Sequence, residues 1–125
     1  MKNLQAKEES FTRYEVPFRL GNLASSLAHI KSCAGNEAHK ELVKSFVEES
    51  KFFIEWTAGD MDIDRAAELA DMQIQLARWQ LTWDRIWADP AELVNVVNTA
   101  KLWSERVLDM SGLLDEPVET ITRSL

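Results

Sequence analysis

The sequence has few of the residues that shape disulfide-rich or turn-rich proteins. Among its 125 residues are one cysteine, three prolines and four glycines. The single Cys33 excludes an intramolecular disulfide and a zinc site built from several cysteines, and it is typical of a protein from a reducing compartment. So few glycines and prolines disfavour a β-sandwich, whose many turns need both residue types. These absences favour a helical domain.

Long apolar runs and an excess of basic residues are also lacking. No stretch approaches the length of about 18 apolar residues that a membrane span needs, and the first residues lack the apolar core of a signal peptide. Fourteen lysines and arginines are outnumbered by 21 aspartates and glutamates, which gives a formal net charge of -7. An acidic chain without a basic stripe is repelled by nucleic-acid phosphates and by anionic lipids. We therefore expect a cytoplasmic protein that binds neither nucleic acid nor a membrane.

Apolar residues that recur at steps of three and four predict amphipathic helices. Four such segments follow one another, at about residues 17–34, 37–57, 62–88 and 90–114. Because the connections between them are short, consecutive helices must fold back on one another. The prediction is an all-α protein, an up-and-down four-helix bundle at 17–114. A polar arm at 1–16, partly helical from Ser10, precedes the bundle, and a short flexible tail at 115–125 follows it.

Capping residues mark several of these helix ends. The segment Asp89-Pro90-Ala91-Glu92 combines an aspartate that can cap the free N–H groups with a proline suited to the first turn. Asn36 is placed to cap the second predicted helix, and Gly112 is placed to end the fourth.

The third predicted helix, 62–88, has two apolar faces on nearly opposite sides. One face is rich in alanine and lets a neighbouring helix approach closely; it contains Ile63, Ala66, Ala67, Ala70, Ile74, Ala77 and Leu81. The other face is bulky and contains Leu69, Met72, Leu76, Trp79, Trp83 and Trp87. A peripheral helix of a bundle usually has one apolar stripe. The bulky face is therefore interpreted as an interface with a second copy or a partner, since tryptophan and methionine are enriched in interface cores. An intramolecular core and a small-molecule pocket stay open as alternatives.

His29 lies opposite the apolar stripe of the first predicted helix, so its imidazole is expected to be exposed. It belongs to the segment Ala28-His29-Ile30-Lys31-Ser32-Cys33-Ala34-Gly35. An exposed histidine followed by a lysine and small residues, on a small acidic helical bundle, resembles the histidine phosphotransfer domain. The resemblance covers these residues only and implies that His29 is a phosphoacceptor. In that family the lysine follows three residues after the histidine and a glycine comes directly next. Lys31 follows after two, turned by about 100°, and Gly35 ends the helix. An ordinary surface histidine is the simpler interpretation.

His39 lies within the apolar arc of the second predicted helix, and Asp84 lies on the third. An up-and-down bundle brings both to the same end, where they can form either a perturbed acid–base pair or, more simply, a buried histidine satisfied by a carboxylate. Neither His29 nor His39 follows a glutamate at the Glu-x-x-His spacing of di-metal bundles. We therefore predict no metal ligands, no cofactor and no catalytic residues.

The sequence thus predicts a non-enzymatic interaction or regulatory protein. It self-associates, as a dimer, or docks a protein partner through Met72, Leu76, Trp79, Trp83 and Trp87. The alternative is a phosphotransfer-like signalling module with His29 as acceptor.

Overall fold

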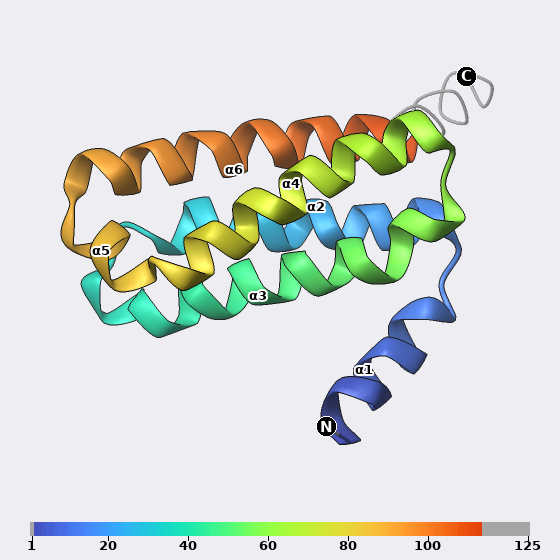
Figure 1. The fold of residues 1–125 in the computed structure, drawn as a ribbon, viewed down its shortest axis with the longest axis horizontal. Helices are drawn as coiled ribbons and strands as arrows, with labels where there is room; N and C mark the ends of the chain where they lie inside the picture. The colour runs from blue at the N-terminus through green and yellow to red at the C-terminus, as the bar shows by residue number, and fades with distance from the viewer. Residues whose placement is uncertain (1, 114–125) are drawn as a thin grey trace, which may run out of the picture.

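The computed structural model describes residues 2–113 (Figure 1). The tail predicted at 115–125 lies outside the described residues. Within 2–113 there are six α-helices, two short 3-10 helices and no strand. The α-helices are α1 (Lys2–Thr12), α2 (Val16–Cys33), α3 (Lys40–Thr57), α4 (Ile63–Leu81), α5 (Trp83–Ala88) and α6 (Pro90–Ser111), and the 3-10 helices are η1 (Glu37–His39) and η2 (Ala58–Asp60). The all-α prediction is confirmed. The predicted four-helix bundle is not, since the structure has six α-helices.

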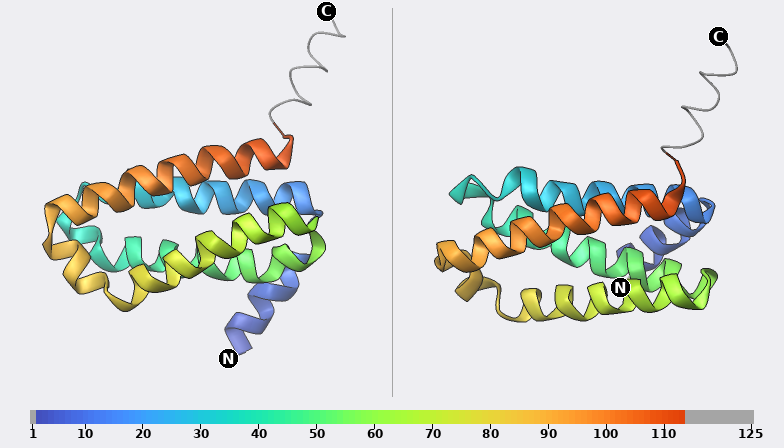
Figure 2. Two further views of the ribbon diagram at one scale, coloured as in Figure 1. Left: turned by 45° about the horizontal axis from the view of Figure 1, so that its top comes forward. Right: turned by 90° about the horizontal axis from the view of Figure 1, so that it is seen from above.

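The four long helices run side by side in alternating directions (Figures 1 and 2). Helix α2 packs against both α3 and α6, and α4 packs against α3. The core lies between them and consists mainly of leucine, isoleucine and valine from α2, α3 and α6 together with the bulky face of α4. Figure 2 shows α4 at the outside of this arrangement, set apart from α6.

The N-terminal segment forms a longer helix than predicted. Helix α1 begins at Lys2, not near Ser10, and projects away from the long helices (Figure 1). Phe11 is buried and stacks on Phe53 of α3, with ring centroids 4.2 Å apart, and it also contacts Trp56. The sequence pattern of α1 is polar, so one aromatic side chain supplies most of its attachment to α3.

The helix predicted at 62–88 is interrupted at Thr82, whose backbone angles are φ -114° and ψ 23°. The Thr82 hydroxyl donates to the Arg78 carbonyl at 2.9 Å, and the Thr82 N–H is shared between the carbonyls of Arg78 and Trp79. A threonine that bonds back to the preceding turn bends a helix. After the bend, Trp83 is buried and its indole N–H donates to the Lys40 carbonyl at 3.0 Å. The bend thus turns α5 toward the start of α3.

The predicted capping residues lie at helix ends in the structure. The Asp89 carboxylate accepts from the N–H groups of Ala91 and Glu92, directly before α6. Gly112 ends the same helix in the left-handed conformation, at φ 71°. The Asn36 side chain accepts from the Ala38 N–H and caps η1, which leads into α3. These short-range signals are satisfied by residues within three positions, so they do not depend on how the helices pack.

A buried arginine joins the two connections at one end of the molecule. Arg19 is 9% exposed. Its guanidinium donates to the carbonyls of Tyr14 at 2.7 Å and Thr12 at 3.3 Å, which fixes the turn between α1 and α2. It also donates to the Trp56 carbonyl at 3.3 Å and to the Asp60 carboxylate at 2.8 Å, at the end of α3 and in η2. One side chain therefore holds both connections, and nothing in the sequence pattern predicted this role.

We expect Arg19→Ala to lower the free energy of unfolding by about 2–3 kcal/mol, because several carbonyls lose a charged donor in a partly buried site. Asp60→Asn is the matched control. It removes only the ion pair with a largely exposed carboxylate and costs less than about 1 kcal/mol. Urea denaturation monitored by circular dichroism measures both. Equal losses in the two variants would show that the ion pair, and not the carbonyl contacts, carries the stabilisation.

Candidate interaction surface

The bulky face of α4 and α5 lies inside the protein. Met72, Leu76, Trp79 and Trp83 are buried, with Trp79 6% and Trp83 1% exposed, and Trp87 is half-buried. Trp79 stacks on Trp103 of α6 with ring centroids 5.1 Å apart, and Trp83 packs against Trp87 at 5.7 Å. The docking surface predicted on these five residues is therefore not available in the folded chain. The intramolecular core, which the sequence left open as an alternative, is their position in the structure.

The physical reason is the difference in size between the two apolar faces of α4. Only one face can point into the core of the chain. A buried tryptophan removes about 150–250 Å² from water, several times what an alanine can remove. Burial of Trp79 and Trp83 thus fixes the rotation of α4 and turns the alanine-rich face outward. Within residues 2–113 no helix covers the alanine-rich face, on which Ile63, Ile74 and Leu81 are exposed.

The outward face presents a continuous apolar stripe. We call it the outer stripe and define it as Ile63, Ala67, Ala70, Ile74, Ala77 and Leu81. Ile63 is 83% exposed, Ile74 53% and Leu81 86%. The steps between successive members alternate between four and three residues, which is the spacing of a seam between two paired helices. The stripe runs along the whole length of α4.

One border of the outer stripe is attached to α3. Gln73 donates to the carbonyl of Lys51 at 3.2 Å and to the carboxylate of Glu55 at 2.8 Å. Gln80 accepts from the Lys51 ammonium at 2.8 Å and donates to the Glu48 carboxylate at 3.2 Å. These polar contacts link this border of α4 to α3.

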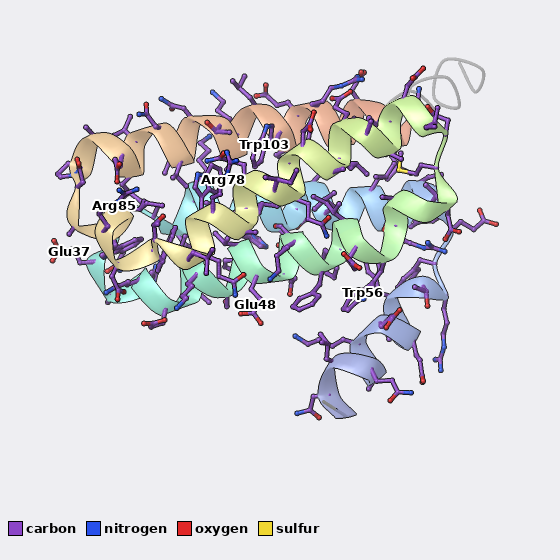
Figure 3. All side chains as sticks on the ribbon, in the orientation of Figure 1. Glu37, Glu48, Trp56, Arg78, Arg85 and Trp103 are labelled. Atoms are coloured by element: carbon purple, nitrogen blue, oxygen red, sulfur yellow. The ribbon has the colours of Figure 1, made fainter. Side chains whose placement is uncertain are left out.

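The other border faces α6 and carries Asp64, Asp71 and Arg78, all exposed. Figure 3 shows Arg78 on the side of α4 that faces α6. It shows Trp103 on the side of α6 that faces α4. Within residues 2–113, neither Asp64 nor Arg78 is in an ion pair or a side-chain hydrogen bond. Their charges are therefore open to an external group.

A groove of about 520 Å³ lies between α4, α5 and α6. Trp79, Ile86 and Val96 form its apolar floor, and Arg78 and Arg85 stand at its rim. Arg85 lies 3.6 Å from the Glu92 carboxylate. This pairing compensates the Arg85 charge within the chain but leaves that of Arg78. The other polar residues of the lining are neutral: Gln75, Thr82, Asn95 and Thr99. The groove contains no histidine and no cysteine.

An ion pair closes the far end of the space between α4 and α6. The Arg106 guanidinium donates twice to the Glu68 carboxylate, at 2.7 and 3.0 Å. This hydrogen bonding lowers the pKa of the Glu68 carboxyl below its ordinary value. This ion pair and the stack of Trp79 on Trp103 together set the distance between α4 and α6.

The predicted pair of His39 and Asp84 does not form. The two residues do lie at the same end, as the topology required, but Asp84 binds the neighbouring Lys40 at 2.9 Å. The hydrogen bond from Lys40 lowers the pKa of the exposed Asp84 carboxyl. The His39 imidazole instead lies 3.3 Å from the Cys33 carbonyl. Residue 39 belongs to the short helix η1, which turns its side chain away from Asp84 and toward the end of α2.

His29 is exposed on α2, as predicted, with the ring of Phe46 4.9 Å away. Lys31 is exposed too. In residues 2–113 no three His, Cys, Asp or Glu side chains are grouped closely enough to hold a metal ion. None of the helices described there combines the length and hydropathy of a membrane-spanning segment.

Comparison of the chain with protein-family models, with curated proteins and with solved structures found no match. The candidate site is the outer stripe together with its charged border, which carries Asp64, Asp71 and Arg78.

The position of Trp83 gives a direct test of which face of α4 belongs to the core. We expect Trp83→Asp to lower the free energy of unfolding by at least about 4 kcal/mol, because it creates a cavity and buries a charge. Thermal denaturation monitored by circular dichroism measures the loss. A folded Trp83→Asp variant with an unchanged melting temperature would place Trp83 on the surface and contradict the burial.

Proposed function

We propose that this protein is a non-enzymatic interaction module that associates with a second copy of itself through the outer stripe of α4. The observation that carries the proposal is the exposure of Ile63, Ile74 and Leu81 in one line along α4. Contiguous apolar patches on a protein surface mark interaction sites far more often than scattered single apolar residues do. The sequence also predicted self-association, but through the tryptophan face. Because that face is buried, we place the contact on the opposite face of α4. The reducing, cytoplasmic location expected from the single cysteine belongs to the same proposal.

The phosphotransfer alternative has one supporting observation, the exposure of His29 on α2. A phosphoacceptor needs polar surroundings, whereas this imidazole has the Phe46 ring 4.9 Å away, tilted by 45°. The spacing of Lys31 also departs from the family pattern. We therefore favour the interaction module.

A single helix face gives a small interface. Interfaces that bury less than about 1,200 Å² belong to weak or transient complexes. The net charge of -7 adds repulsion between copies. We accordingly expect a dissociation constant in the micromolar range or above, which sets the concentrations at which association must be measured.

The proposal predicts that Ile74→Asp weakens self-association at least tenfold, or about 1.4 kcal/mol, because a carboxylate would have to be desolvated in an apolar seam. Ile74 is exposed in the folded chain, so the free energy of unfolding should change by no more than about 1 kcal/mol. Sedimentation equilibrium from roughly 1 µM to roughly 1 mM protein measures the dissociation constants.

Val94→Asp is the matched control for this experiment. Val94 is 56% exposed on α6 and lies outside the outer stripe, so its substitution should leave the dissociation constant unchanged. A monomeric wild-type protein at every concentration would contradict the proposed function. An equal effect of Ile74→Asp and Val94→Asp would show that α4 is not the contact.

A further inference from the structure

We infer that the two copies pair antiparallel, with the α4 helices related by a twofold axis beside Met72 and with Asp64 and Arg78 as the residues that fix this orientation. The inference rests on the proposed function, because it concerns the same outer stripe. It adds the direction and register of the pairing and the residues that select them.

The outer stripe is symmetric about Met72 in the sequence. Ala70 and Ile74 lie two residues before and after it, Ala67 and Ala77 five, and Ile63 and Leu81 nine. A twofold axis at this position therefore faces every member of the stripe with another member: Ala70 with Ile74, Ala67 with Ala77, and Ile63 with Leu81 at the two ends. An interface between identical copies must be self-complementary in this sense.

The alternation of large and small side chains suits close packing in this register. Alanines at 67 and 77 let the two backbones approach, as small residues do at tight helix contacts. The exposed Ile63 and Leu81 side chains then cover one another at both ends of the seam. With 19 residues, α4 is about 28 Å long, so the seam extends along the helix without an interruption.

Charge complementarity selects the antiparallel direction. Asp64 follows Ile63 and Arg78 follows Ala77 on the same border of the stripe, near opposite ends of α4. In the antiparallel register Asp64 of each copy lies beside Arg78 of the other, which gives two equivalent ion pairs. In a parallel pair these borders meet the opposite borders, where Ala66, Gln73 and Gln80 carry no charge. Only the antiparallel arrangement places Asp64 beside Arg78, and neither of these two side chains is in an ion pair among residues 2–113.

One feature of the border opposes the pairing. Asp71 lies next to Met72 on the same border as Asp64, so the two copies of Asp71 approach each other near the axis. Like charges at an exposed rim repel, and salt screens this repulsion. Asp71→Asn should therefore tighten the dimer, whereas a substitution at Asp64 should weaken it.

The charge pattern is tested by reversing each partner separately. Asp64→Arg places two arginines at both ends of the dimer, and Arg78→Asp places two aspartates there. Each variant alone should self-associate about tenfold more weakly than the wild type, because two attractive rim pairs become repulsive. An equimolar mixture should form a heterodimer with the affinity of the wild type, since both ion pairs are restored with opposite polarity. A mixture no tighter than the separate variants would overturn the assignment of Asp64 and Arg78.

Disulfide trapping tests the direction independently of charge. Ala67→Cys and Ala77→Cys are made separately in a Cys33→Ser chain. In the antiparallel register two copies of residue 67 are about 15 Å apart, which is too far for a disulfide, while residue 67 of one copy faces residue 77 of the other. Each variant alone should stay uncrosslinked under mild oxidation, and the mixture should give a covalent dimer.

The outcomes separate this inference from the proposed function. Covalent dimers of Ala67→Cys alone and of Ala77→Cys alone, in a protein whose association depends on Ile74, would establish a parallel pair and overturn only the present inference. Association of the protein without a crosslink in either variant or in their mixture would also overturn only the present inference. A chain that stays monomeric throughout would overturn the proposed function itself.

Discussion

The structure depends on one packing constraint, the burial of Trp79 and Trp83. Both are tryptophans that are almost fully buried, and they fill the space that faces α3 and α6. Their burial sets the rotation of α4 about its own axis. The rotation in turn decides which residues of α4 reach solvent, because the two apolar faces lie on opposite sides. The stack of Trp79 on Trp103 also sets the separation of α4 from α6.

An exposed apolar stripe on a fixed helix is costly for an isolated chain. Ile63 and Leu81 are almost fully exposed, and their burial against another surface would release about 25 cal/mol for each Å² of apolar area removed from water. Gln73 and Gln80 at one border of the stripe bind α3. A rotation of α4 that hid the stripe would break these contacts and would expose the tryptophans on the opposite face. Among residues 2–113 no segment covers Ile63, Ile74 or Leu81. Their burial against a second copy is the physical basis of the proposed function.

The sequence predicted the helix ends that depend on local residues, and it predicted only part of the packing between helices. The ends of α6 followed from Asp89 and Gly112 because capping involves residues a few positions apart. The two apolar faces of α4 were also recognised, but which of them enters the core depends on the volume available between α3 and α6. A comparison of side-chain size would have indicated the buried face, since the core takes the larger apolar area.

Other features could not be predicted because they depend on long-range contacts. The break at Thr82 accompanies the bond from Trp83 to the Lys40 carbonyl, 43 residues away in sequence. Helix α1 packs through Phe11 on an aromatic pair of α3, which a polar sequence pattern does not reveal. The contacts of Arg19 reach four separate backbone or carboxylate oxygens, and Asp84 binds Lys40 because the turn at η1 brings that lysine nearer than His39.

The central claim, that the outer stripe of α4 is the contact surface, is tested most directly by hydroxyl-radical footprinting at low and high protein concentration. The method measures how accessible individual side chains are in the wild-type protein. The account predicts that the oxidation rates of Ile63, Ile74 and Leu81 fall as the protein associates, while that of Val94 on α6 stays constant. Constant rates for all four residues at concentrations where the mass has doubled, or protection at Val94 alone, would contradict it.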